Sequence, residues 1–164
     1  MTVIDTPVDR SIVHEVEQFI FNELLLLDEF KYHEWLDLFA EDGLFWLPAN
    51  LDDYDPAKHT SIIYNDKAQL ALRIKRLEMG RVVQEIRSRL AHQVSNLLIL
   101  EDDGDEITVR VVLTVFEVQR LRKSMYPGHC IYKLRRTDDG LKIVLKKQCL
   151  IDNDTYYQHL AFMV

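Results

Sequence analysis

The strongest constraint on the fold is the second half of the chain, where apolar and polar residues alternate over long stretches. Candidate strands with this period of two cover residues 90–101, 106–122, 129–137 and 141–152. Two acidic turns, EDDGDE and TDDG, fall between them, and Asp-Gly is a strong signal for a hairpin. The closing segment TYYQHLAFMV is either one more edge strand or a docked tail. This half of the chain predicts a sheet of long antiparallel strands.

The first half of the chain predicts helices. Apolar residues recur at helical spacing up to Asp28-Glu29, at Ile12, Val16, Phe19, Ile20, Leu24 and Leu27. A second short helix, ending near AEDG, is marked by Tyr32, Trp35, Leu36 and Phe39. The segment LFWLP, residues 44–48, predicts a strand, and residues 50–61 predict a polar loop.

A third helix is predicted after Asn65-Asp66, which can cap it, with Leu70, Ile74 and Leu77 on its apolar face. Helices followed by long antiparallel strands indicate an α+β fold, in which the helices pack on one face of a curved sheet. No repeat or break in composition divides residues 1–164, so we expect a single domain.

Charge and cysteine content narrow the possible partners and the compartment. The net charge of −7 argues against nucleic acid or an anionic membrane, because both require a basic surface. No apolar run approaches the roughly 20 residues of a membrane span. Cys130 and Cys149 are the only cysteines, and the N-terminus lacks the pattern of a signal peptide. We therefore expect a cytoplasmic protein with two reduced thiols.

Common cofactor motifs are missing from the sequence. Iron–sulfur and structural zinc sites need several cysteines or closely spaced Cys/His pairs. In GHC, residues 128–130, the His and Cys side chains of a strand would point to opposite faces. Neither a glycine-rich phosphate loop nor a G-x-S-x-G elbow occurs. We expect no cofactor and no metal on this chain.

One constellation could carry chemistry. A regular strand over 90–100 places His92, Val94, Asn96, Leu98 and Leu100 on one face. Asp28, or Tyr32 and Trp35, could approach that face from the helices. His92 beside a carboxylate could be a general base. Equally, the cluster could tie strand to helix, since an unbonded buried polar group costs roughly 1–3 kcal/mol. Spacing favours the structural interpretation and leaves the catalytic one open.

A second candidate is the pair Phe45 and Trp46. Adjacent residues of a strand face opposite ways, so one ring lies outside the core or is covered by another subunit. An outward Trp46 is therefore a candidate interface residue.

Several segments, taken in order, resemble a known family, the small (beta) subunits of bacterial aromatic-ring-hydroxylating dioxygenases. FIFNELLLLDEFKYHEWLDLFAEDGLFWLPA, residues 19–49, is similar to the family's opening, and SIIYNDKAQLALRIKRLEMG, residues 61–80, to its D-x-x-x-L-x-x-R segment. SRLAHQVSNLLI resembles the signature S-R-x-x-H-x-[IV]-[ST]-N from Ser88 to Asn96. GLKIVLKKQCLIDNDTY resembles the last long strand.

This resemblance implies a cystatin- or ketosteroid-isomerase-like cone, in which a strongly curved, mixed and mostly antiparallel sheet encloses the N-terminal helices. It implies a trimer of this chain supporting three large (alpha) subunits in an α3β3 oxygenase. The alpha subunit of that family carries the Rieske [2Fe-2S] cluster and a mononuclear Fe(II), and the beta subunit is structural and non-catalytic. The chain departs from the family pattern at His129, Ile131 and Tyr132.

Three functional hypotheses follow. The first is a non-catalytic beta subunit, with a hydrogen-bonding seam at the start of a central strand formed by Ser88, Arg89, His92, Ser95 and Asn96. The second is a stand-alone dehydratase or isomerase of the cone fold, with His92 as base and Asp28 or Tyr32 assisting. The third is a ligand-binding cone without chemistry. The resemblance favours the first.

Overall fold

The computed structural model describes residues 10–50, 55–79, 87–154 and 162–163. Its helices are α1 (Arg10–Asp28), α2 (Tyr32–Asp37) and α3 (Lys67–Glu78). Its strands are β1 (Phe39–Pro48), β2 (Ser61–Asp66), β3 (Arg89–Asp102), β4 (Glu106–Gln119), β5 (Arg122–Thr137) and β6 (Gly140–Leu150). None of these helices combines the length and hydropathy needed to cross a membrane.

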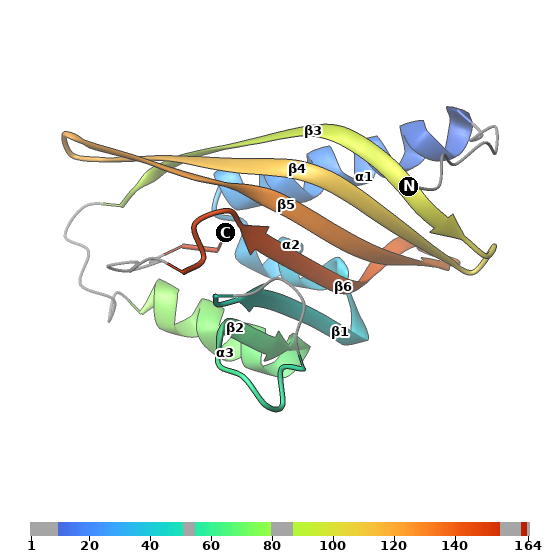
Figure 1. The fold of residues 1–164 in the computed structure, drawn as a ribbon, viewed down its shortest axis with the longest axis horizontal. Helices are drawn as coiled ribbons and strands as arrows, with labels where there is room; N and C mark the ends of the chain where they lie inside the picture. The colour runs from blue at the N-terminus through green and yellow to red at the C-terminus, as the bar shows by residue number, and fades with distance from the viewer. Residues whose placement is uncertain (1–9, 51–54, 80–86, 155–161, 164) are drawn as a thin grey trace.

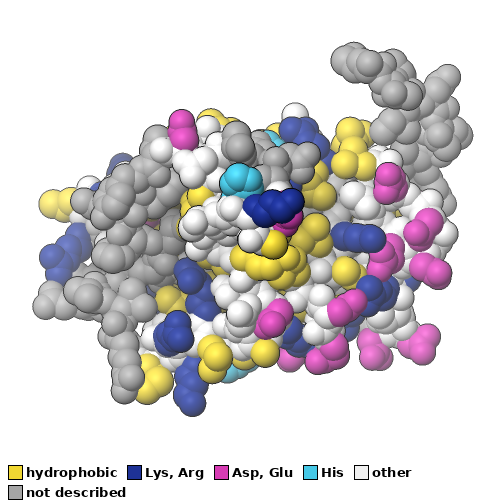
Figure 2. Space-filling model, turned by 60° about the horizontal axis from the view of Figure 1, so that its bottom comes forward, with side chains coloured by type: hydrophobic (Ala, Val, Ile, Leu, Met, Phe, Trp, Pro, Cys, Tyr) yellow, Lys and Arg dark blue, Asp and Glu magenta, His cyan; other side chains and the backbone are white. Residues whose placement is uncertain are grey.

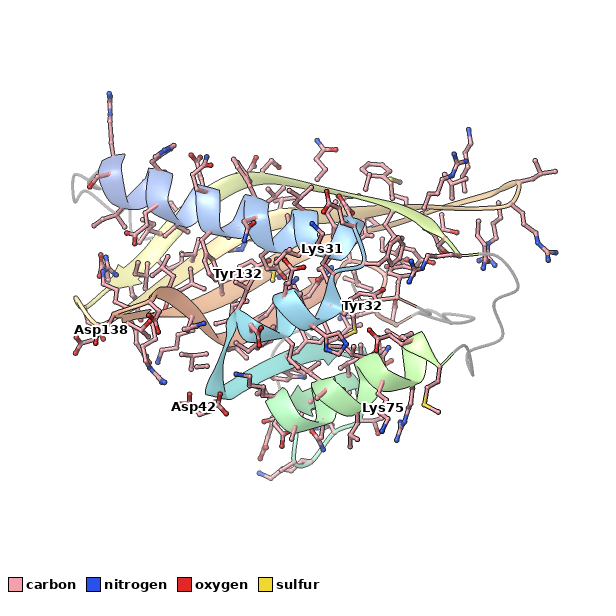
Figure 3. The ribbon with its side chains drawn as sticks, turned by 180° about the vertical axis from the view of Figure 1, so that it is seen from behind. Lys31, Tyr32, Asp42, Lys75, Tyr132 and Asp138 are labelled. Atoms are coloured by element: carbon pink, nitrogen blue, oxygen red, sulfur yellow. The ribbon has the colours of Figure 1, made fainter. Side chains whose placement is uncertain are left out.

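The strands form one curved sheet with the order β2-β1-β6-β5-β4-β3 (Figure 1). β1 runs parallel to β6, and every other neighbouring pair is antiparallel. All three helices lie on the same side of the sheet (Figure 3), with α1 against β3 and α3 against β1. The predicted α+β cone, with N-terminal helices in a mixed and mostly antiparallel sheet, is confirmed.

The core lies between the helices and the inner face of the sheet. The alternation predicted for β4 is visible in its burial, because five alternate side chains are fully buried: Ile107, Val109, Val111, Leu113 and Val115. They belong to the same core cluster as the apolar face of α1, where Val16, Ile20 and Leu27 are also fully buried. Burial of this kind, worth roughly 1.5–3 kcal/mol per large aliphatic side chain, holds α1 in the cone.

The predicted cap of the third helix is confirmed in detail. The Asp66 carboxylate accepts a hydrogen bond of 2.8 Å from the Gln69 amide, and the Gln69 side chain accepts one of 3.0 Å from the Asp66 amide. This capping box satisfies donors that the first turn of a helix leaves without partners. Leu70 and Ile74 point inward and are fully buried.

Several predicted elements differ from the structure. The strand predicted over 44–48 begins at Phe39 as β1, and the strand predicted over 129–137 begins at Arg122 as β5. Phe39 begins β1 and pairs with Ile143, because α2 ends two residues earlier at Asp37. β2 was missed, since its short sequence SIIYND shows no clean alternation and Asp66 is also the cap of α3. The strand predicted over 106–122 ends at 119, and β5 starts at 122 after a two-residue turn. That turn, Arg120-Leu121, lacks the residues that usually mark one.

The end of the chain is described at only two positions, Phe162 and Met163; residues 155–161 and 164 of the predicted strand or tail lie outside the described residues. Phe162 is 1% exposed and Met163 is fully buried. The Phe162 ring packs edge-on against Tyr126, with the ring centroids 5.6 Å apart. Neither residue belongs to a strand, so both fit the docked-tail alternative.

Gly128 marks a close backbone approach between β5 and β6. It pairs with Leu113 on one side and Leu150 on the other. A Cβ atom at this position would lie 2.3 Å from the carbonyl oxygen of Cys149. Only glycine therefore lets β6 approach β5 closely at the end of the cone where the strand terminates.

We expect Gly128→Ala to destabilise the fold by about 3 kcal/mol, because the clash involves backbone that has to shift. Gly104→Ala is the matched control: its Cβ meets nothing within 4 Å, although its φ of +96° makes alanine cost about 1–2 kcal/mol. Urea denaturation of both variants measures the difference. A Gly128→Ala loss no larger than that of Gly104→Ala would contradict the close approach.

Candidate functional site

His92 and Asp28 come together, which is one of the two approaches that the sequence left open. His92 Nδ1 lies 2.7 Å from Asp28 Oδ1, and the His92 backbone amide donates to both carboxylate oxygens at 3.2 Å. The His92 side chain is fully buried, whereas that of Asp28 is 26% exposed. Because an ionised carboxylate only accepts hydrogen bonds, Nδ1 is the donor of this pair. Asp28, the last residue of α1, therefore fixes both the backbone and the ring of His92.

The second ring nitrogen of His92, Nε2, is the atom that could act as a base. Nε2 is buried and has no hydrogen-bond partner among the described residues. A histidine oriented through Nδ1 by a carboxylate is a general-base arrangement, provided that a substrate can reach Nε2. The same contact is also a strand-to-helix tie. What surrounds the pair therefore decides between the two interpretations.

Tyr32 and Trp35 have hydrogen-bond partners other than His92. Burial raises the pKa of Tyr32, partly offset by Arg87 and by a hydrogen bond from the backbone of Met163. The Tyr32 hydroxyl is therefore engaged with the end of the chain. Trp35 is fully buried, and its Nε1 donates to Glu23 at 2.6 Å.

Glu23 is the centre of a buried polar cluster that no pattern in the sequence predicted. Besides Trp35, it accepts hydrogen bonds from Tyr132 Oη at 3.1 Å and from Lys146 Nζ at 2.7 Å. The side chains of Glu23 and Lys146 are both fully buried. Figure 3 shows Tyr132 on the side of the sheet that faces the helices. The cluster joins α1, α2, β5 and β6.

The electrostatics of this cluster keep its neighbours protonated. Burial, and then the Glu23 charge, raise the pKa of Tyr132 well above its ordinary value, so the phenol remains a donor. Burial raises the pKa of Cys130 to about 12, so its thiol is not a nucleophile at neutral pH. The only sign in the sequence that Glu23 is buried was its position, because it shares a helical face with Ile20 and Leu27.

Ser88 belongs to a second polar cluster. It is 3% exposed, and its hydroxyl donates to Glu117 Oε1, while Tyr126 Oη donates to Glu117 Oε2 at 2.9 Å. Burial and this hydrogen bond raise the pKa of Tyr126, so it too stays protonated. These contacts tie the residues before β3 to β4 and β5.

The remaining residues of the predicted seam lie elsewhere. Arg89, Ser95 and Asn96 are exposed, and β3 is an edge strand, not a central one. Asn96 has a φ of +53°, and the β3–β4 register shifts between Ser95 and Leu98. The prediction that Asn96, Leu98 and Leu100 share the face of His92 was therefore wrong.

The register shift between Ser95 and Leu98 is a β-bulge, which offsets the alternation of β3 by one residue. Leu97 and Ile99 therefore lie on the inner face with His92. Leu98 is instead 46% exposed.

Trp46 does lie on the face opposite Phe45, but this chain itself covers it. Its exposure is 9%, and its Nε1 donates to Ser61 Oγ at 3.0 Å. Lys147 Nζ lies 4.3 Å from the ring centroid of Trp46, and Tyr64 packs edge-on against it. Trp46 is thus largely packed within the subunit, which weakens its standing as an interface residue.

The positions that depart from the family pattern lie on two different faces of β5. Tyr132 is inside and belongs to the Glu23 cluster, whereas the alternation of β5 puts His129 and Ile131 outside. Cys130 points inward, away from His129, as the spacing of GHC predicted. Over the described ranges, no group of three His, Cys, Asp or Glu side chains could hold a metal ion.

Comparison with known proteins places this geometry in a family. The family model for the ring hydroxylating beta subunit matches residues 22–157. The small oxygenase component of the p-cumate 2,3-dioxygenase system of Pseudomonas putida is 33% identical over 148 residues, covering 88% of this chain and 82% of that protein. The 2-halobenzoate 1,2-dioxygenase small subunit of Burkholderia cepacia is 32% identical over 151 residues, covering 88% and 90%.

A solved structure gives the same answer for the fold. The beta subunit of benzoate 1,2-dioxygenase from Burkholderia mallei superimposes with a TM-score of 0.77 at 26% identity, covering 99% of this chain and 100% of that one. The sequence match includes Glu23, Asp28, His92 and Lys146 within its bounds. The chain belongs to the family of ring-hydroxylating dioxygenase beta subunits.

Proposed function

We propose that three copies of this chain support three large subunits in a cytoplasmic α3β3 oxygenase that adds O2 to an aromatic ring. The Rieske [2Fe-2S] cluster and the mononuclear Fe(II) belong to the large subunit. The observation that supports a structural role is that side chains of this chain fill the interior of the cone. Phe162 and Met163 are buried there, and the polar groups Glu23, Tyr132 and Lys146 bond one another.

The names of the relatives point to a substrate class. They are components that act on p-cumate, 2-halobenzoate and benzoate, which are all aromatic carboxylates. We extend this class to the complex that contains the present chain. The binding site for the carboxylate belongs to the large subunit in this proposal.

His92 is a strand-to-helix tie in this proposal. Asp28 accepts two kinds of hydrogen bond from His92, one from the ring and one from the backbone. A base would need only the first, whereas a tie that holds β3 against the end of α1 uses both. Nε2, which has no partner in the described part of the chain, is the observation that favours the dehydratase or isomerase alternative.

The first test is assembly. Expressed alone, the chain should be colourless, bind no iron and leave benzoate unchanged. Co-expressed with its cognate large subunit, it should elute as a coloured complex with equal numbers of the two chains, and light scattering should give the mass of six subunits. A chain that stays separate from the large subunit would refute the proposal.

The second test separates the two roles of His92. His92→Ala should lower the free energy of unfolding by about 2–4 kcal/mol, since it removes packing and a charge-assisted hydrogen bond. His92→Asn is the matched variant, because its amide can still donate to Asp28 but is not a base. We expect His92→Asn to recover part of the stability, measured by urea denaturation.

Oxygenase activity of the complex assembled with the His92→Asn chain should equal that of the wild-type complex within a factor of about two, because the chemistry lies on the large subunit. The catalytic alternative makes a different prediction. It requires the isolated wild-type chain to turn over a hydroxylated cyclic substrate, and both substitutions to abolish that turnover.

The third test addresses the buried ion pair. Lys146→Met should cost about 3–5 kcal/mol, because Glu23 then remains buried without its partner. The double variant combines Lys146→Met with Glu23→Gln. Its loss in free energy of unfolding should be smaller than the sum of the two single losses by about 1–3 kcal/mol. The reason is that the amide oxygen still accepts a hydrogen bond from Trp35 or Tyr132 without carrying a charge.

Lys142→Met on the same strand is the control, because the Lys142 ammonium bonds the Asp37 carbonyl at 2.7 Å in an exposed setting. It should cost less than about 1 kcal/mol. Additive losses in the double variant would show that Glu23 and Lys146 do not stabilise each other.

A further inference from the structure

The hairpin that joins β4 to β5 ends in an unusual turn. Gln119 pairs with Arg122, so Arg120 and Leu121 form a two-residue loop. Arg120 has a φ of +55°, in the left-handed region where such loops normally place Asn, Asp or Gly. Leu121 is 99% exposed. Both residue choices are unfavourable for an isolated hairpin, so they need another reason.

The turn continues into an exposed apolar row on the outer face of the sheet. Phe116 and Met125 pair directly across β4 and β5, and they are 39% and 57% exposed. Val115 and Tyr126, which also pair with each other, face the core. Together, Phe116, Leu121 and Met125 form the apolar part of what we call the hairpin tip, residues 116–125.

The hairpin tip is also locally basic, although the chain as a whole is acidic. Residues 118–125, VQRLRKSM, contain Arg120, Arg122 and Lys123 and no acid, although the whole chain carries −7. Arg89 lies beside them, because it pairs with Val118. The one acid of the tip, Glu117, is 8% exposed and bonded to Ser88 and Tyr126.

Exposed acids gather at the other end of the molecule. The turns that precede Glu106 and Gly140 carry them, namely Asp102, Asp103, Asp105, Asp138 and Asp139. Figure 1 shows these turns at the right and the hairpin tip at the left, and in Figure 2 acidic side chains gather at the right. The long axis of the chain is therefore electrically polar.

We propose that the hairpin tip docks into an apolar socket, rimmed by acidic residues, on the large oxygenase subunit. The inference rests on the proposed function, because it needs that subunit as a partner. An apolar centre provides affinity when it is buried, and a rim of opposite charge provides orientation and a faster encounter. Leu121 is the central anchor, and Lys123 belongs to the charged rim.

A second copy of this chain also has acidic surface and is therefore the alternative partner for the hairpin tip. The acids of its two acidic turns, however, lie at the opposite end of the long axis from the hairpin tip. A contact between opposite ends of identical subunits propagates an open chain, whereas a closed trimer needs patches inclined to one another. The geometry therefore favours the large subunit.

The experiment uses the full complex with its cognate large subunit and follows its dissociation on dilution by mass photometry. Leu121→Ser and Met125→Ser should each raise the dissociation constant by roughly ten-fold, as truncation of a central anchor does. Lys123→Glu should slow association, and its effect should shrink as the salt concentration rises from about 0.05 to 0.5 M.

Two substitutions away from the hairpin tip are the controls. Leu72→Ser removes a side chain that is 56% exposed on α3, and Arg10→Glu reverses an exposed charge at the start of α1. Neither should change the dissociation constant more than about two-fold. All five variants should melt at the wild-type temperature, because the substituted side chains contribute little to the core.

Each result has a defined meaning. Unchanged affinity of the tip variants for a large subunit that binds the wild-type chain overturns the docking inference alone. Tip variants that lose only self-association of the isolated chain also overturn it and identify a second copy as the occupant. A wild-type chain that never binds the large subunit overturns the proposed function and this inference together.

Discussion

The ion pair between Glu23 and Lys146 is the interaction on which the rest of the structure depends. It joins the first helix to the last strand, and Trp35 and Tyr132 add bonds from α2 and β5. A charge in a protein interior is tolerated only when it is paired and hydrogen-bonded. Few placements of α1 satisfy four buried polar groups at once. That placement carries Asp28 to His92, so the candidate site follows from the ion pair.

Much of the fold could be predicted because its signals are local. Alternation identified most of β3 to β6, and Asp66 with Gln69 identified the start of α3. The Glu23–Lys146 pair could not be predicted, since each residue alone is more often solvated and their meeting depends on the tertiary fold. The bulge at Asn96 was equally hidden, because no local pattern marks the inserted residue that moves Leu97 and Ile99 to the inner face.

The candidate site shows how little separates a structural tie from a catalytic base. The spacing of His92 and the position of Asp28 made their meeting one of the possibilities, and the geometry of the pair suits either role. What spacing cannot reveal is access to Nε2. That depends on which residues distant in sequence pack around the ring, and no local pattern indicates them.

The parallel pairing of β1 with β6 has a consequence for the order in which the molecule can form during synthesis. Glu23 leaves the ribosome 123 residues before Lys146, and β1 has no neighbour on its β6 side until residues 140–150 are made. The helices and the β1–β2 hairpin must therefore wait, with apolar surface exposed, for the last strand. Contacts so distant along the chain make folding slow. In the cell, the time before β6 emerges is when this subunit most needs protection from aggregation.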